Sequence, residues 1–206
     1  MMEYDAEPIR GLPGRLPPGE HIIWQGAPDW STSARSVYRI RIVASYFALL
    51  AAAGLITGSV VGALVTLGVG LLGLGLLALL AWGSARTTVY TLTNRRMVLR
   101  VGVAIPKCFN LPLSLIAGAD LRRQADGHGD IALTMIGAPS FGYALLWPHA
   151  RPWKMREPQP MLRAIPDAEM VAARLTRACA ALVAIDRAAP VAIAPSAAPQ
   201  PLGAVA

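Results

Sequence analysis

Charged residues and histidines are missing from one long stretch of this 206-residue chain. Between Ile42 and Ala85 there is no Asp, Glu, Lys, Arg or His, and Leu, Ala, Gly and Val dominate. The three histidines, His21, His128 and His149, all lie outside this run. Without an imidazole, the run lacks the usual protein ligand for a haem or a chlorophyll. We therefore expect no cofactor, and pigment delivery is the weakest functional hypothesis.

Cysteine is scarce, and the common catalytic motifs are absent. Cys108 and Cys179 share no CxxC spacing, so we expect reduced thiols rather than a disulfide. The chain contains no GxxxxGK[ST], GxSxG or HExxH motif, and no GxGxxG ahead of a helix. The GHGD turn at 127–130 offers one His and one Asp, fewer than the three protein ligands of a catalytic zinc site. The sequence therefore predicts a non-enzymatic protein without a metal.

The uncharged run predicts a membrane anchor. A spanning helix needs roughly 20 apolar residues, so the run fits two spans better than one. We place them at about 40–57 and 61–82, within a hairpin of residues 38–85. The first 40 residues carry several charges, unlike a cleavable signal, so we expect the run to stay in the membrane. Arginines flank both ends of the run, which predicts a multi-pass membrane protein with both termini cytoplasmic.

Small residues recur at intervals of four near the turn of this hairpin. Gly54, Gly58 and Gly62 form two overlapping GxxxG steps. This spacing lets helix backbones approach closely in lipid. We expect membrane-helix packing at these three glycines. The partner is either the other span, which we favour, or another membrane protein.

The formal net charge of +7 does not require a nucleic acid. The arginines gather beside the apolar run, where each contributes about 1 kcal/mol of attraction to an anionic leaflet. The candidate contacts to anionic lipid are Arg86, Arg95, Arg96 and Arg100.

A soluble domain is predicted over residues 86–187. Residues 1–37 form an N-terminal cytoplasmic segment, in which 22–25 could add a strand, and the Ala/Pro-rich residues 188–206 are expected to be a disordered tail. Asp167 is a good N-cap for a helix over 167–185, whose apolar face should pack on a sheet.

Short strands account for most of the predicted domain. Residues 87–92 and 96–101 alternate in hydropathy around the turn Thr93-Asn94-Arg95, which predicts a hairpin. Further strands are expected at 108–111, 118–123, 131–135 and 143–146, and prolines are expected to break regular structure over 148–160. The predicted fold class is membrane-anchored α+β: a two-helix transmembrane hairpin and a small PH-like antiparallel barrel or sandwich capped by a C-terminal helix.

The phrases flanking the run resemble those of a known group. LPPGEHIIWQGAPDW (Leu16–Trp30) before it and YTLTNRRMVLRVG (Tyr90–Gly102) after it resemble bacterial PH-like membrane proteins. A fuller set is similar to a narrower family, the PuhB-type assembly proteins for the photosynthetic reaction centre of purple bacteria. This set comprises LPPGE, WQGAPDW, FNLPLSLIAGADLR, GHGDIALTMIG, WPHARPW and MLRAIPDAEMVAARL. The resemblance runs from about Glu7 to Leu182.

This resemblance implies a factor of the bacterial inner (intracytoplasmic) membrane that helps to assemble the reaction centre and the core light-harvesting complex, with no catalytic residues. The expected partners are reaction-centre and core antenna subunits and anionic membrane lipids, and a homodimer is left open. Candidate surface contacts are Trp24, Trp30, Arg95 and Arg96, although packing explains the two tryptophans equally well. The alternative is an anionic-lipid-binding PH-like module of general envelope function.

Overall fold

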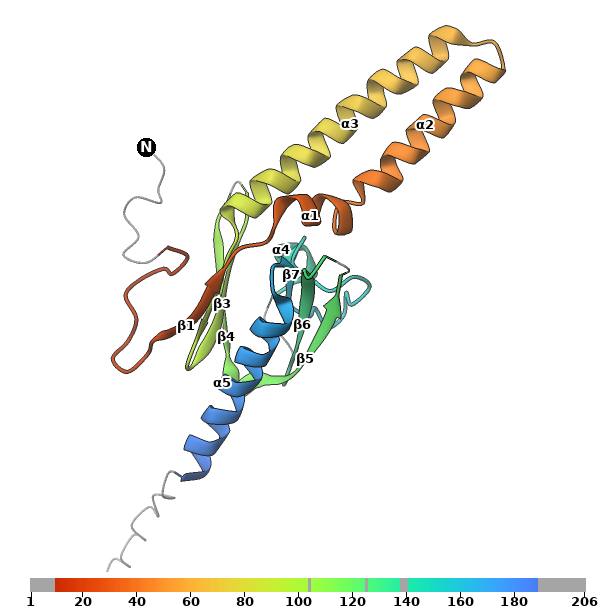
Figure 1. Ribbon diagram of the computed structural model, residues 1–206. Helices are drawn as coiled ribbons and strands as arrows, with labels where there is room; N and C mark the ends of the chain where they lie inside the picture. Colours follow the sequence, from red (N-terminus) through yellow and green to blue (C-terminus); the bar gives the residue numbers. More distant parts are fainter. Residues whose placement is uncertain (1–9, 104, 125, 138–140, 189–206) are drawn as a thin grey trace, which may run out of the picture.

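A pair of long helices projects from a domain of short strands (Figure 1). The computed structural model describes residues 10–103, 105–124, 126–137 and 141–188. The predicted disordered tail lies outside these residues, apart from Ala188 at the end of the last helix. The strands are β1 Ile22–Gly26, β2 Val89–Thr93, β3 Arg96–Val101, β4 Lys107–Pro112, β5 Ile116–Arg123, β6 Gly129–Met135 and β7 Met161–Ile165. The helices are α1 Trp30–Ser36, α2 Ile40–Ile56, α3 Val60–Thr87, the 3-10 turn η2 Leu113–Leu115, α4 Tyr143–Leu146 and α5 Ala168–Ala188.

The strands form two antiparallel sheets, with the orders β1-β2-β3-β4 and β5-β6-β7. The predicted hairpin of β2 and β3 is present, with Tyr90 opposite Leu99. Its turn contains Asn94, whose side chain donates to the Gly19 carbonyl at 2.9 Å and accepts from the His21 N–H at 3.0 Å. These bonds tie the turn to the segment before β1, which pairs with β2 as the possible strand at 22–25 predicted.

Both sheets and α5 contribute side chains to one hydrophobic core. The first sheet supplies Leu92 and Met97, the second supplies Ile131 and Leu162, and all four are fully buried. Burying each such side chain contributes about 1.5–3 kcal/mol to folding. The apolar face of α5 closes the core, as predicted, through Val171, Leu175 and Ala178. The mixed α+β architecture with antiparallel sheets is consistent with a PH-like domain.

Between residues 143 and 165 one prediction was wrong and one strand was not predicted. Tyr143–Leu146 is the short helix α4, in which the Trp147 N–H donates to the Tyr143 carbonyl at 3.1 Å. Four residues with the sequence YALL are too few to distinguish a helical from an extended period. Beyond the prolines, β7 is a fully buried strand that the sequence reading missed.

The start of α5 also differs from the predicted N-cap. The helix begins at Ala168, and Asp167 has a φ of 52°, whereas a capping residue normally has an extended backbone. The Asp167 carbonyl nevertheless accepts the first helical bond, from the Val171 N–H at 3.2 Å.

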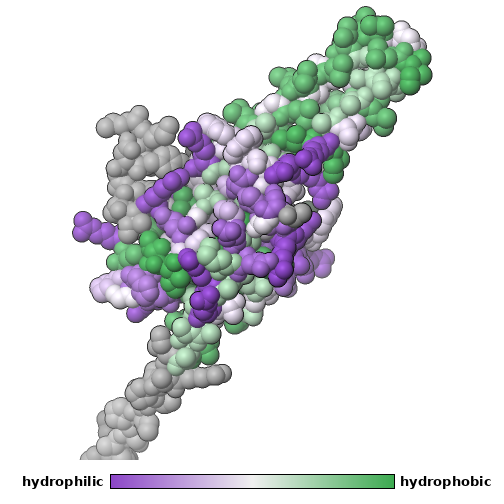
Figure 2. All heavy atoms as spheres, in the orientation of Figure 1, coloured by the Kyte–Doolittle hydropathy of each residue, from purple (hydrophilic) through white to green (hydrophobic). Residues whose placement is uncertain are grey.

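The helices α1, α2 and α3 are inserted between β1 and β2. Asp29 begins the insertion by capping α1, because its carboxylate accepts from the Thr32 N–H at 2.8 Å. Helices α2 and α3 run side by side to a turn at Gly58, whose φ of 78° suits glycine (Figure 1). They pack through small residues, and Ala51 and Ala63 are 4% and 1% exposed. The outward residues of the pair are apolar, in contrast to the polar surface of the β domain (Figure 2).

Length and composition distinguish the two long helices. Among the described residues, α3 is the one helix that is by itself long and apolar enough to cross a membrane, with 28 residues or about 42 Å. Helix α2 has 17 residues, about 26 Å, and meets the same test only together with α1, from which it is bent by 53°. Outward side chains of both helices, such as Leu49 at 72% and Leu72 at 77%, are largely exposed.

Candidate binding site at the helix end of the domain

We define the helix end as the end of the β domain from which α2 and α3 project. It includes α1, the junction at 37–39, the last turn of α3, the loop between β3 and β4, and residues 143–155 after β6. Contacts join these segments. The Tyr38 ring packs edge-on against Trp147 at 6.1 Å, and the Val103 side chain lies close to Gly83 of α3. Segments far apart in the sequence therefore meet around the base of the helix pair.

Four of the five tryptophans lie at this end with exposed rings. Trp30 is 50% exposed, Trp82 45%, Trp147 57% and Trp153 90%. The loop between β3 and β4 adds the exposed Ile105, at 72%. Amphipathic rings gathered in this way are typical of proteins that meet a membrane–water interface.

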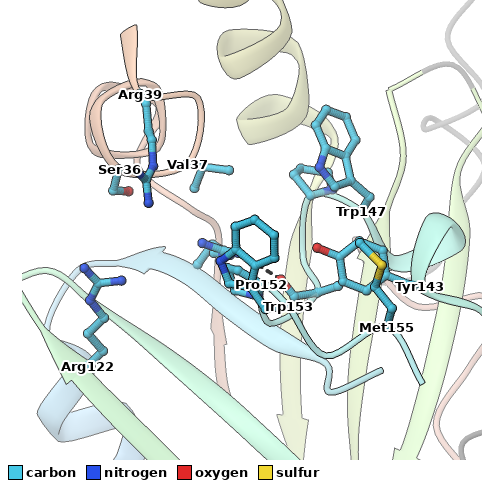
Figure 3. A pocket seen from close by; sticks show the side chains of 12 residues that line it. Ser36, Val37, Arg39, Arg122, Tyr143, Trp147, Pro152, Trp153 and Met155 are labelled. Atoms are coloured by element: carbon cyan, nitrogen blue, oxygen red, sulfur yellow. Dashed lines mark hydrogen bonds between the residues drawn. The ribbon is translucent and has the colours of Figure 1, made fainter. Parts of the chain in front are cut away.

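A cavity of about 340 Å³ opens between the α1–α2 junction, β5 and residues 143–155 (Figure 3). Arg39 and Arg122 reach it from the junction and from β5, and the Trp153 ring lies beside the Tyr143 and Trp147 group (Figure 3). Its lining residues are Ser36, Val37, Arg39, Arg122, Tyr143, Trp147, Pro148, Ala150, Pro152, Trp153, Met155 and Arg163. This lining is basic and aromatic and includes no carboxylate.

The third arginine of the lining, Arg163, is held in β7 and is only 7% exposed. Its Nη2 donates to the Ala150 carbonyl at 2.8 Å, but its buried Nε has no hydrogen-bond partner among the described residues. Burial lowers the pKa of the Arg163 guanidinium, and the charge of Asp130 opposes this effect. Asp130 itself accepts from the Ala164 N–H at 2.8 Å.

A buried hydrogen-bond network supports the wall of this cavity. The two ring nitrogens of His149 contact the Thr88 hydroxyl at 3.1 Å and the Tyr90 hydroxyl at 2.7 Å. The Tyr90 hydroxyl also accepts from the backbone N–H of Arg163 at 3.1 Å. Burial lowers the pKa of His149 to about 3, so the imidazole is neutral at physiological pH. This network links the first strand after α3 to β7 and to residues 149–150.

The structure separates the arginines that the sequence grouped as lipid contacts. Arg86 is exposed at the helix end, with its guanidinium 4.9 Å from the Trp82 ring centroid. Arg95 and Arg96 lie at the opposite end of the domain, because β2 carries the chain about 17 Å away from α3. Arg96 also pairs with Glu20, at 2.8 Å from Nε to Oε1 and 3.1 Å from Nη2 to Oε2.

Arg100 corrects the prediction most clearly, because it is only 4% exposed and cannot meet a lipid surface. Alternation along β3 placed it on an outward face. However, Val89, directly opposite Arg100 in the sheet, contacts Gly11 of the N-terminal segment. That segment covers this side of the sheet, which local alternation could not reveal.

The predicted tryptophan and glycine sites have mixed outcomes. Trp24 is partly buried against the core, so packing explains this residue. Trp30 is exposed beside Arg86 and Trp82 in a second, shallow hollow. Gly54 faces Ala63 of α3, so it packs the two helices together. Gly58 forms the turn, and a Cβ at Gly62 would meet Ser59, a neighbour in its own helix end, rather than α2.

Several site residues were not singled out by the sequence. Arg39 was counted only as a flanking charge, and Arg122, Trp147 and Trp153 appeared only within quoted phrases. For Trp147 and Trp153, the available signal was the pairing of basic and aromatic residues in WPHARPW; Arg39 and Arg122 lie outside this phrase. Among the described residues, no group of three or more His, Cys, Asp or Glu side chains is placed to hold a metal ion.

Comparison with known proteins gives the family. Residues 40–178 match the family described as Bacterial PH domain. The chain is also 37% identical over 189 residues to a Rhodobacter capsulatus protein described as "Uncharacterized 23.7 kDa protein in puhA 5'region", and the match covers 87% of this chain and 88% of that protein. No solved structure matches the chain. The chain belongs to the bacterial PH domain family.

Proposed function

We propose that this protein is a non-enzymatic membrane assembly factor for the photosynthetic reaction centre and core light-harvesting complex. A two-span hairpin anchors it in the bacterial inner membrane, and the PH-like domain lies on the cytoplasmic side with both termini. The observation that carries the proposal is the apolar helix pair α2–α3, which is rooted between two paired strands of a folded domain.

The exposed apolar surface supports membrane insertion of both helices. Ile56 and Val61, on either side of the turn, are 86% and 75% exposed. Water would oppose such exposure, whereas lipid favours it. The lower part of α3 has a different environment, because Ala81 and Ala85 are buried against the domain. We infer that the part of α3 nearer the turn lies in the membrane and that α2 crosses the membrane beside it.

The arrangement suits protein contacts rather than chemistry. In lipid, helices associate through close packing of small residues. On α3, Gly68 and Gly75 are seven residues apart and have open space where a Cβ would stand. They offer a partner helix a close approach without disturbing the contact to α2.

The choice of partner rests on the resemblance of the quoted phrases to PuhB-type assembly proteins. The name of the Rhodobacter capsulatus relative gives that protein a position in the puhA 5′ region and no activity. The proposed partners of this chain are therefore reaction-centre and core antenna subunits, and dimer formation remains part of the hypothesis.

Deletion of the gene in its native photosynthetic host tests the proposal. We expect reaction-centre absorbance per cell to fall several-fold, with recovery when the wild-type gene is returned. Normal reaction-centre levels in the deletion strain would contradict the assembly role. A Gly68→Leu/Gly75→Leu variant should restore less than a Leu72→Ile/Leu79→Ile control, because only the first pair blocks close helix approach.

A second candidate is a general anionic-lipid-binding membrane module, favoured by the basic cavity at the helix end. The same deletion strain separates the two functions. A general envelope role predicts defects during growth without photosynthesis, whereas the assembly role predicts normal growth under those conditions.

A further inference from the structure

We propose that the cavity at the helix end binds the phosphate of an anionic phospholipid from the cytoplasmic leaflet, with Arg39 and Arg122 as its principal ligands. The inference rests on that part of the proposed function that places α2 and α3 in the membrane. It names a lipid site that differs from the arginines expected from the sequence.

The position of the cavity along the membrane normal is the first argument. Arg39 is the residue immediately before α2, and it lines the cavity. If α2 enters the hydrocarbon region at its first turns, Arg39 lies at the depth of the lipid headgroups. The exposed rings of Trp147 and Trp153 at the same cavity are suited to that depth.

Charge is the second argument. The lining contains three arginines and no Asp or Glu. The charge of Arg122 is close enough to contribute to the lowered pKa of Arg163, after the larger effect of burial. Asp130, which is not part of the lining, offsets part of the charge of Arg163, whereas the lining offers no carboxylate to Arg39 and Arg122. Guanidinium groups that share a cavity favour an anion between them. The N-terminus of α2 has no side-chain cap and begins one residue after Arg39, so its dipole adds positive potential.

An unused hydrogen-bond donor is the third argument. The Nε of Arg163 is buried and has no partner among the described residues. Buried donors in folded proteins are almost always satisfied, so an orphaned N–H beside a cavity indicates a missing acceptor. The Nε is closed off from the cavity in this structure, so a phosphate oxygen accepts from it only after the Arg163 side chain turns toward the cavity. The guanidinium fork matches phosphate geometry better than an ammonium does.

The backbone at the cavity is the fourth argument. Trp153 has a φ of 66° and Arg39 a φ of 51°, both in the left-handed region that such side chains rarely adopt. Such conformations cost free energy and concentrate at binding sites. Trp153 is also 90% exposed, so the strained backbone presents its ring outward instead of packing it. The volume of about 340 Å³ accommodates a phosphate with its glycerol group.

Lipid binding to the full chain tests the inference. The protein is purified in an uncharged detergent and titrated with phosphatidylglycerol, and native mass spectrometry measures the affinity for the first retained lipid. We expect Arg39→Gln/Arg122→Gln to weaken binding at least tenfold. The charge-matched control, Arg95→Gln/Arg177→Gln, lies away from the cavity and should change the affinity less than twofold. Arg39, Arg122, Arg95 and Arg177 are all exposed, so both variants should fold.

Two further ligands identify the chemistry. Phosphatidylcholine should bind at least tenfold more weakly than phosphatidylglycerol, and inorganic phosphate should displace phosphatidylglycerol only in large molar excess. Equal binding of the two lipids would overturn the preference for an anionic lipid. Displacement by phosphate at equal concentration would show a site for the free anion, and equal losses in the two double variants would overturn the assignment of the cavity.

Failure of this inference is distinguishable from failure of the proposed function. If the chain resists carbonate extraction and the deletion strain lacks reaction centres, but Arg39→Gln/Arg122→Gln binds phosphatidylglycerol like the wild type, only the lipid site is wrong. If carbonate releases the chain from membranes, the membrane placement shared by both proposals is wrong.

Discussion

The hydroxyl of Tyr90 lies 2.7 Å from Nδ1 of His149 inside the domain, although 59 residues separate them in the chain. Both side chains are buried, with exposed fractions of 0% and 2%. Their rings also meet edge-on, at 5.8 Å between centroids. This pair joins the strand that follows α3 to the segment that lines the cavity, so the helix pair and the candidate site share one buried connection.

Acidification should destabilise the fold through His149. Burial lowers the pKa of His149 from 6.5 to about 3. Between these values the unfolded chain binds a proton that the folded chain excludes. The stabilisation that depends on neutral His149 is therefore fully present above pH 6.5. Between pH 6.5 and about 3, the free energy of unfolding falls by about 1.4 kcal/mol for each pH unit. Thermal unfolding of the detergent-solubilised protein from pH 7.5 to pH 4 measures this slope.

The matched variants for this test are His149→Gln and His21→Gln. The first should lower stability at pH 7 and flatten the dependence on pH, because the titrating group is gone. The second replaces an exposed histidine and should retain the wild-type slope. An unchanged slope in His149→Gln would contradict the assignment to this residue.

Arg96 and Arg95 are neighbours with different expected roles in stability. The Glu20 side chain is 2% exposed and pairs with Arg96 through two hydrogen bonds. Burial alone would raise the pKa of Glu20, but the bonds from Arg96 and Thr93 leave it below 4.5. Arg96→Met should therefore cost about 2 kcal/mol at pH 7, because a buried carboxylate loses its partner. Arg95→Met should cost less than about 0.5 kcal/mol, as an exposed site does.

The pH dependence checks the mechanism of this effect. The stabilisation by the pair is present above pH 4.5 and is lost as the pH falls through the folded pKa of Glu20. The two variants should thus become more alike in unfolding temperature below that pH. If the difference in unfolding temperature between Arg96→Met and Arg95→Met stays constant into the acid range, the loss in Arg96→Met comes from packing and not from the ion pair.

Gly70 is a second point of close approach between α2 and α3, in addition to the predicted Gly54. A Cβ at Gly70 would stand 2.8 Å from the Phe47 ring, whereas a Cβ at Gly73 would meet open space. Gly70→Val should therefore cost about 1–3 kcal/mol through overpacking. Gly73→Val, a matched change on the same helix, should change the unfolding temperature little. Equal effects of the two variants would contradict a close approach at Gly70.

Local patterns predicted the elements that local physics decides. The hairpin of β2 and β3 followed from alternation around Asn94, and α5 followed from its apolar period. The buried strand β7 was missed because the prolines before it suggested irregular structure. Helix α1 was missed because its sequence, WSTSARS, has no apolar stripe. Its formation depends on the Asp29 cap and on packing against α3.

The candidate site was beyond local prediction for a different reason. Arg39, Arg122 and Trp153 come from three distant segments, and only the tertiary fold brings them to one cavity. Arg100 of β3 illustrates a different error. It was predicted to lie on the surface, but the N-terminal segment buries it. Charge beside the apolar run led to the hypothesis of an anionic partner, and the fold was needed to choose the residues that we propose to bind it.

Cysteine labelling tests the proposed orientation in the membrane. With Cys108 and Cys179 replaced by serine, one cysteine is introduced either at Arg95, exposed at the far end of the domain, or at Ser59, exposed in the turn between α2 and α3. If both helices cross the membrane and the domain is cytoplasmic, a membrane-impermeant maleimide should label Arg95→Cys in inside-out vesicles and Ser59→Cys in intact spheroplasts. Labelling of both positions from the same side would contradict a two-span hairpin. Labelling with the two sides exchanged would keep the hairpin but reverse the orientation, and it would also remove the cytoplasmic leaflet as the source of the lipid bound near Arg39.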